Sequence, residues 1–176
     1  MKFTIGAEYP FWIINTHEGG YIMFKEIRRK DRKLENSEAE ELLKRCDYGI
    51  LSTLNQEGYP YGVPVNYVYL NNALYFHCAL EGSKIKNISI NSKVSFCVVG
   101  KTCVIPDEFT TNYESVVVFG VAGEVLGEEK YNALLEILNK YSKEYLETGK
   151  SYIRKMEDKT KVIKIEVEHI SGKARK

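Results

Sequence analysis

The sequence is poor in the residues that build metal sites and disulfide frameworks. Of 176 residues, four are cysteines: Cys46, Cys78, Cys97 and Cys103. They form no C-x-x-C pair, and the three histidines His17, His77 and His169 are scattered along the chain. This pattern favours neither a metal site nor a set of structural disulfides. We therefore expect no bound metal, and reduced thiols in a cytoplasmic protein.

Long hydrophobic runs and an excess of charge are also missing. Glu8 and Pro10 interrupt the apolar residues near the start before a signal peptide could form, and no run reaches the length of a membrane span. Lys and Arg number 25 against 24 Asp and Glu, a net charge of +1. We therefore expect neither nucleic acid nor a membrane as a partner. The absence of G-x-G-x-x-G and Walker A runs argues against Rossmann or P-loop nucleotide binding.

The first 22 residues differ from the rest, because they show neither a helical nor an alternating period. They end in Glu18-Gly19-Gly20-Tyr21-Ile22, directly before Met23. One interpretation is a start site assigned too early, since codons for Glu-Gly-Gly can contain a ribosome-binding sequence. The other is an extension that packs its aromatic residues on the surface or across a dimer interface. We therefore divide the chain into an atypical segment, residues 1–22, and one domain, residues 23–176.

Six β-type runs dominate residues 23–176. They cover residues 48–54, 59–70, 73–79, 94–105, 116–126 and 162–169. Most follow one another through short polar turns, which is typical of antiparallel pairing. The order predicts a mainly β fold with α additions: a six-stranded antiparallel split β-barrel, Greek-key-like, with flanking helices.

Helical periods occupy the remaining stretches. A short helix over residues 38–46 is expected to begin with a capping box of Ser37 and Glu40. A second short helix follows Ser83, and a longer one starts at Gly127. One or two further helical turns are expected after Gly149.

The clearest candidate binding site is Gly82-Ser83-Lys84, where a strand ends and a helix begins. Free N–H groups at a helix start, a hydroxyl and an ammonium together suit a phosphate group. The alternative is that Ser83 only caps the helix and Lys84 is only solvated.

The order of parts resembles the pyridoxamine 5′-phosphate oxidase-like FMN-binding split-barrel family, in particular its nitroimidazole-resistance branch. The resemblance covers Met23 to Lys173. It rests on the basic run Arg28–Arg32, the strand Gly58–Tyr67, the segment Tyr75–Lys84, and the pair Tyr113–Gly120 and His169–Lys173.

The resemblance implies a homodimer with FMN at the interface, and it assigns residues to the cofactor. Those expected along the isoalloxazine ring are Val63, Pro64, Val65 and Asn66. Those expected at the phosphate are Gly82, Ser83 and Lys84. Those expected from the second subunit are Ser115, Val116 and Val117, with Lys173 near the flavin. For residues 116–119 the alternative is plain barrel core, and both interpretations can hold for one strand.

His77 matches a histidine that the nitroimidazole-resistance branch carries beside the flavin. This implies a catalytic residue that exchanges a proton with the substrate, whereas the alternative is a structural hydrogen bond. The function implied is an FMN-dependent oxidoreductase that takes electrons from a reduced donor such as NAD(P)H and passes them to a small acceptor such as a nitroimidazole or another nitroaromatic. Alternatives are a non-catalytic flavin-binding or redox-sensing protein, and a haem-binding split barrel with His77 or His169 as ligand.

Overall fold

The computed structural model describes residues 24–176, so the segment expected as an extension lies outside the described residues. The strands are β1 (Tyr48–Leu54), β2 (Pro60–Asn66), β3 (Val68–Leu70), β4 (Ala73–Cys78), β5 (Lys93–Ile105), β6 (Thr110–Val125) and β7 (Lys161–Arg175). The α-helices are α1 (Asn36–Arg45), α2 (Ser83–Ile90), α3 (Gly127–Tyr141) and α4 (Leu146–Met156). A 3₁₀ turn, η1 (Lys30–Arg32), precedes α1. None of the described helices is long and apolar enough to cross a bilayer.

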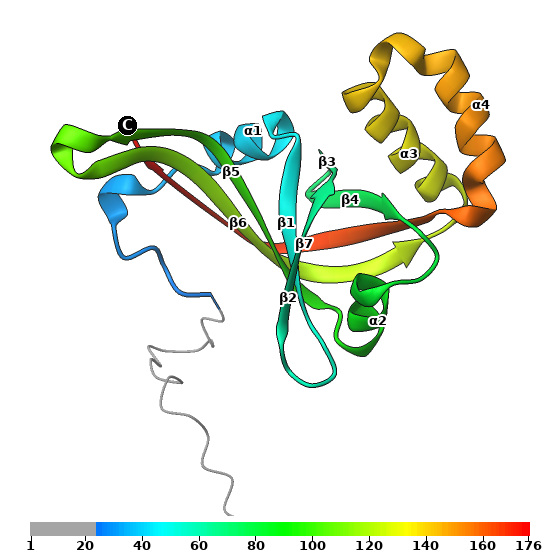
Figure 1. Cartoon of the computed structure of the whole chain (residues 1–176), viewed down its shortest axis with the longest axis horizontal. Helices are drawn as coiled ribbons and strands as arrows, with labels where there is room; N and C mark the ends of the chain where they lie inside the picture. The colour runs from blue at the N-terminus through cyan, green and yellow to red at the C-terminus, as the bar shows by residue number, and fades with distance from the viewer. Residues whose placement is uncertain (1–23) are drawn as a thin grey trace, which may run out of the picture.

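All seven described strands belong to one antiparallel sheet, in the order β2-β1-β5-β6-β7-β4-β3 (Figure 1). The two edge strands, β2 and β3, are consecutive in the chain and separated only by Tyr67. The segment from Pro60 to Leu70 therefore runs from one edge of the sheet to the other and closes it into a split barrel. The mainly β, antiparallel fold class is confirmed.

The predicted count of six strands is wrong by one, because the run over residues 59–70 is divided at Tyr67. The Tyr67 N–H donates to the Tyr141 hydroxyl at 3.0 Å, and the Tyr67 carbonyl accepts from the Lys140 ammonium at 3.1 Å. Two side chains at the end of α3 thus satisfy the backbone groups that a continuous strand would use in its ladder.

Two apolar clusters hold the fold together. The interior of the barrel contains fully buried side chains from five strands: Leu51, Leu74, Phe96, Val118 and Ile165 are examples, one from each. A second cluster lies outside the barrel, where α3 packs its Leu134 and neighbours against β3, β4 and β7. The sheet is therefore covered on both sides at β4 and at the start of β7, whereas its β2-β1-β5-β6 part has an uncovered outer side.

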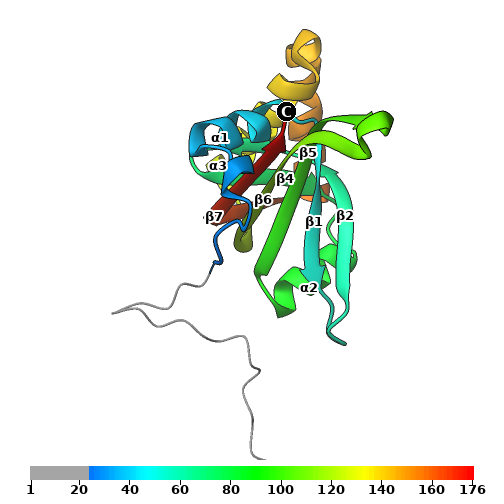
Figure 2. The same cartoon turned by 90° about the vertical axis from the view of Figure 1, so that its left-hand side faces the viewer.

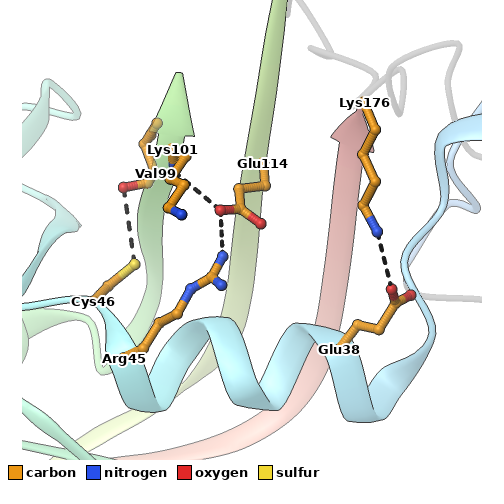
Figure 3. A network of polar contacts seen from close by, with 7 residues as sticks. All are labelled: Glu38, Arg45, Cys46, Val99, Lys101, Glu114 and Lys176. Atoms are coloured by element: carbon orange, nitrogen blue, oxygen red, sulfur yellow. Dashed lines mark hydrogen bonds and ion pairs between the residues drawn. The ribbon is translucent and has the colours of Figure 1, made fainter. Parts of the chain in front are cut away.

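Helix α1 is fixed to the sheet by polar contacts as well as by packing (Figure 3). Arg45 forms an ion pair with Glu114 of β6, whose carboxylate also accepts the backbone N–H of Lys101 at 3.1 Å. The predicted capping box was displaced by two residues. The backbone N–H of Glu35 donates to the Glu38 carboxylate at 3.0 Å, so the helix begins at Asn36.

Helices α3 and α4 form a hairpin at the opposite side of the molecule from the β5–β6 hairpin (Figure 1). The helix expected after Gly149 begins earlier, at Leu146, and includes that glycine. A Cβ at Gly149 would lie 2.3 Å from the Leu138 side chain, so only glycine lets α4 approach α3 this closely.

Candidate functional site

The start of α2 presents backbone N–H groups to solvent. The first hydrogen bond of the helix runs from the Lys86 N–H to the Gly82 carbonyl at 3.0 Å. The N–H groups of Ser83, Lys84 and Ile85 therefore have no partner inside the helix. Gly82 occupies the N-cap with φ of 136°, a conformation that disfavours any L side chain, and the Ser83 hydroxyl makes no cap bond. The cap expected at Ser83 is therefore wrong by one residue.

Helix α2 lies beside the β1–β2 hairpin (Figure 2). A hollow of about 280 Å³ is lined by residues of both. Ser83 and Lys86 line it from the helix, and Tyr59 and Tyr61 line it from the hairpin. Lys84 does not line this hollow. Burial raises the pKa of Cys78 at the end of β4, and the charge of Lys84 acts to lower it. The three N–H groups and the Ser83 hydroxyl lie together at this helix start, and the phosphate site predicted at Gly82-Ser83-Lys84 stays a prediction.

Strand β2 lies at the edge of the sheet and pairs only with β1 among the described strands. Val63 and Val65 point inward and pack against the barrel core, whereas Pro64 and Asn66 lie on the outer side. The Asn66 amide donates to the Asp47 carbonyl at 3.0 Å. Because one side of the strand is unpaired, its backbone groups there are available to a ligand. Val63 and Val65 can therefore contact an external ring through the backbone, as the resemblance implies.

His77 lies close to this edge. Val68 of β3 pairs with Tyr75 of β4, and β2, which ends two residues before Val68, contacts β4. The His77 side chain is exposed, whereas the preceding Phe76 is fully buried. Although the ring reaches solvent, the atoms packed around it desolvate it and lower its pKa below 6.5. The residues predicted at the phosphate, the ring and the catalytic position thus form one group, which we call the β2–α2 group.

The other predicted residues form a second group, on β6 and β7. Ser115 pairs with Lys173 across the two strands, and Val117 lies on the same outer side. The Val116 side chain points the other way and has no exposed surface, so it belongs to the barrel core. We call Ser115, Val117 and Lys173 the β6–β7 group.

The two groups lie on one face but are separated within a single chain. One row of paired residues crosses the outer side of the sheet: Pro64, Ile50, Cys97, Val117 and Ser171. From Pro64 to Val117 this row spans three strand spacings, roughly 14 Å. The structure therefore brings each group together but does not join the two.

The outer side of the β2-β1-β5-β6 sheet is apolar, which the site prediction missed. Tyr48 is 62% exposed, Val99 58%, Phe119 38% and Ile50 36%. The signal was present in β1, whose residues are apolar at both alternating sets of positions, a pattern typical of strands covered on both faces. At the margin of this face Phe24 stacks on His169, with ring centroids 4.8 Å apart. No periodic pattern could have revealed that contact.

Comparison with known proteins assigns this fold and site to a family. The family model described as pyridoxamine 5′-phosphate oxidase matches residues 35–174. The chain belongs to the pyridoxamine 5′-phosphate oxidase family. The predicted family is thus confirmed, and the match includes all residues of the β2–α2 and β6–β7 groups. No curated protein matches the chain.

Three solved structures show how this family member compares with others. A candidate 5-nitroimidazole antibiotic resistance protein from Bacteroides thetaiotaomicron is 26% identical, with a TM-score of 0.69 over 81% of this chain and 86% of its own. An FAD-binding protein from Mesorhizobium loti is 22% identical, with a TM-score of 0.59 over 82% and 98%. An FAD- and haem-binding protein from Mycobacterium smegmatis is 14% identical, with a TM-score of 0.73 over 82% and 74%. The fold is thus shared with flavin- and haem-binding proteins.

Proposed function

We propose that this member of the pyridoxamine 5′-phosphate oxidase family binds FMN as a homodimer and acts as an FMN-dependent oxidoreductase. It takes electrons from a reduced donor such as NAD(P)H and passes them to a small acceptor such as a nitroimidazole or another nitroaromatic. The observation that carries the proposal is the β2–α2 group, where an open helix start, an unpaired strand edge and an exposed histidine lie together.

The helix start holds the phosphate of FMN. Three N–H groups, the Ser83 hydroxyl and the Lys84 ammonium supply donors and positive charge for a dianion, and α2 adds its dipole. A terminal monophosphate can place three oxygens against these donors, whereas a bridging phosphate in a longer cofactor has fewer free oxygens. This difference favours FMN over FAD.

In this proposal strand β2 binds the isoalloxazine ring, and His77 supplies a proton beside it. The unpaired backbone groups of β2 would hold the isoalloxazine by hydrogen bonds, with Pro64 and Asn66 beside it on the outer side of the strand. His77 lies on β4, which contacts β2, and its imidazole would give a proton to the acceptor there. When bound, the flavin supplies the electron-transfer chemistry itself.

A second copy of the chain completes the site. A flavin bound at the β2–α2 group does not reach the β6–β7 group of the same chain, because about 14 Å of apolar sheet separates them. If two outer faces pack together about a two-fold axis, the β6–β7 group of one chain meets the β2–α2 group of the other. The apolar side chains between the groups then become buried.

The similarity to solved structures supports a nitro compound as the electron acceptor. The 26% identical structure from Bacteroides thetaiotaomicron is described as a candidate 5-nitroimidazole antibiotic resistance protein, which favours a nitro compound. The FAD-binding structures favour a flavin.

Replacement of Lys84 tests the proposal. Lys84→Ala should weaken FMN by about 1–3 kcal/mol, the contribution of a charge-assisted hydrogen bond, and should leave riboflavin almost unaffected because riboflavin has no phosphate. Dissociation constants for both ligands come from fluorescence titration of the apoprotein. Lys155→Ala on α4, another lysine replaced at an exposed position, is the control and should change neither value.

Two results would contradict this assignment. Equal weakening of FMN and riboflavin would show that Lys84 supports the fold rather than the phosphate. An absorption spectrum of the purified protein with an intense Soret band, or an extracted chromophore that is FAD, would replace FMN as the cofactor.

A further inference from the structure

The last two residues of α3 bind backbone groups of two distant links in the chain. The Lys140 ammonium donates to the Cys46 carbonyl at 2.6 Å and to the Tyr67 carbonyl at 3.1 Å. The Tyr141 hydroxyl donates to the Asp47 carbonyl at 2.5 Å and accepts from the Tyr67 N–H at 3.0 Å. We call these five residues the Lys140 clamp. It joins the end of α3 to the link between α1 and β1 and to the link between β2 and β3.

The clamp holds a charge that no nearby carboxylate neutralises. Within residues 24–176, no carboxylate oxygen lies within 4.0 Å of the Lys140 ammonium. The ammonium lies 4.3 Å from the centre of the ring of Tyr67, a residue with no exposed surface. Cys46 is the C-cap of α1, where carbonyls lack partners in the helix and the helix dipole is negative. The positive charge is thus held by carbonyl groups and a ring face, which together define one place for the ammonium.

A lysine is a costly residue to place here. Burial lowers the pKa of Lys140, because it disfavours the charged form. An apolar side chain of similar length would fill the same space without that cost, but it could not bind the two carbonyls. The residue type is therefore explained by its hydrogen bonds, and these fix the relative position of the two links.

The clamp reaches the proposed flavin site through Asn66. This residue ends β2 and directly precedes Tyr67, whose N–H and carbonyl are both bound by the clamp. The Asn66 amide donates to the Asp47 carbonyl at 3.0 Å, so it shares an acceptor with the Tyr141 hydroxyl. Among the described strands β2 pairs only with β1, which leaves its other side without a ladder. The clamp is therefore a second support for this end of β2, beside β1.

We propose that Lys140 and Tyr141 are positioning residues of the flavin site, which fix Asn66 and the end of β2 beside the isoalloxazine ring. Neither residue lines the hollow at the start of α2, so they act through the backbone of the β2–β3 link. Helix α3 thus contributes to cofactor binding from outside the barrel. This inference rests on the proposed function, and it names residues that the resemblance did not assign.

Two variants of the full chain test the clamp. Lys140→Met keeps the length of the side chain and removes the ammonium, and Tyr141→Phe removes only the hydroxyl. Because the flavin ring loses its support and the phosphate site does not, each variant should weaken FMN and riboflavin by the same factor, about tenfold for Lys140→Met and less for Tyr141→Phe. Lys140→Arg keeps a charged donor and should recover most of the affinity. Lys143→Met, at an exposed lysine just beyond α3, is the control and should change the affinity for neither ligand.

The absorption spectrum of the protein saturated with FMN separates positioning from stability. Hydrogen bonds to the flavin ring tune its electronic structure, so a displaced strand should shift the visible bands of bound FMN. Both variants should show this shift, and Lys140→Arg should reverse it. Variants that lose unfolding free energy but give the native spectrum when saturated would overturn the inference, whatever their affinity. If Lys140→Met does not fold, Tyr141→Phe decides by the same readouts.

Acceptor reduction, measured on the same samples, separates this inference from the proposed function. A native protein that binds FMN but reduces no acceptor would refute the proposed oxidoreductase, while shifted spectra in both variants would still support the clamp. A native protein that reduces nitro compounds, with native spectra and affinities in both variants, would refute the clamp alone. A native protein that binds no flavin would refute both, because the clamp is proposed to act on a bound flavin.

Discussion

At the scale of single residues, the decisive question is what His77 does. Its side chain is exposed on β4, a strand that contacts the edge strand β2. A histidine that only supports the fold would more often hydrogen-bond inside the protein through its ring, and the His77 ring makes no hydrogen bond to another described residue. An exposed ring with unused nitrogens at the edge of the proposed flavin site is free to move a proton.

Replacement of His77 by asparagine should therefore affect turnover more than binding. His77→Asn should keep most of the FMN affinity and lower acceptor reduction per bound flavin by about 10²-fold, the usual effect of a lost general acid. Flavin occupancy and turnover are measured on the same sample. Unchanged turnover per bound flavin would remove His77 from the mechanism.

The direction of the pH dependence follows from the lowered pKa of His77. Desolvation holds the pKa below 6.5, so the protonated ring is lost as the pH rises through a value below 6.5. If the protonated ring donates, the native rate should fall over that range and His77→Asn should show no such fall. The same shift makes the folded state bind protons less readily than the unfolded chain. The protein should therefore lose unfolding free energy as the pH falls from the pKa of His77 in the unfolded chain through its lower pKa in the folded protein. His77→Asn should reduce this loss.

The position of a residue could be predicted where it depends on neighbours in the sequence, and could not where it depends on residues far away in the chain. The open helix start at Gly82–Lys84 could be predicted because it depends on a few neighbouring residues. The core position of Val116 follows from strand alternation, which left both interpretations open. The stack of Phe24 on His169 joins residues far apart in the chain and has no periodic signature.

At the scale of elements, a buried polar link orients α2. The Asn87 amide, 4% exposed, donates to the Thr53 hydroxyl of β1 at 2.9 Å. That hydroxyl donates in turn to the Tyr61 carbonyl of β2 at 3.5 Å. The chain of bonds thus connects the helix proposed to bind the phosphate with the strand proposed to bind the ring. Its function is positioning, since neither side chain belongs to the β2–α2 group itself.

Breaking this link should separate phosphate binding from ring binding. Thr53→Val leaves the Asn87 amide unpaired and should cost about 1–3 kcal/mol of unfolding free energy, measured by denaturant titration. Because the tilt of α2 is no longer fixed, FMN affinity should fall more than riboflavin affinity. Thr53→Ser restores the hydroxyl and should recover the ratio of the two affinities. A variant that loses stability but keeps this ratio would limit the link to a structural role.

The elements themselves were largely predictable, and their divisions were not. Alternation and β-branched residues predicted the strands, and helical periods predicted α3. The division of the strand at Tyr67 was not predicted, because it depends on Lys140 and Tyr141, which lie more than 70 residues away in the chain. A local pattern of valines and tyrosines cannot reveal that side chains from a distant helix replace its ladder bonds.

At the scale of the whole molecule, one uncovered apolar face coincides with an incomplete site. Isolated exposed apolar residues need no explanation, but Tyr48, Ile50, Val99 and Phe119 share one side of the sheet. The two groups of site residues border this face on opposite sides. A two-fold dimer through this face would remove the apolar surface from water and join the groups in the same step.

A charge at the centre of that face should therefore abolish assembly and cofactor binding together. Ile50 lies in the row between Pro64 and Cys97, so Ile50→Glu would place a carboxylate inside the proposed interface, where no water solvates it. Sedimentation velocity should show a dimer for the native protein and a monomer for this variant. The monomer should bind FMN much more weakly although its own β2–α2 group is intact, because the β6–β7 group of the partner is gone.

Leu126→Glu, at an exposed leucine between β6 and α3, is the matched control and should stay dimeric and loaded with FMN. A native monomer with tightly bound FMN would show that one chain is sufficient and that the apolar face has another purpose.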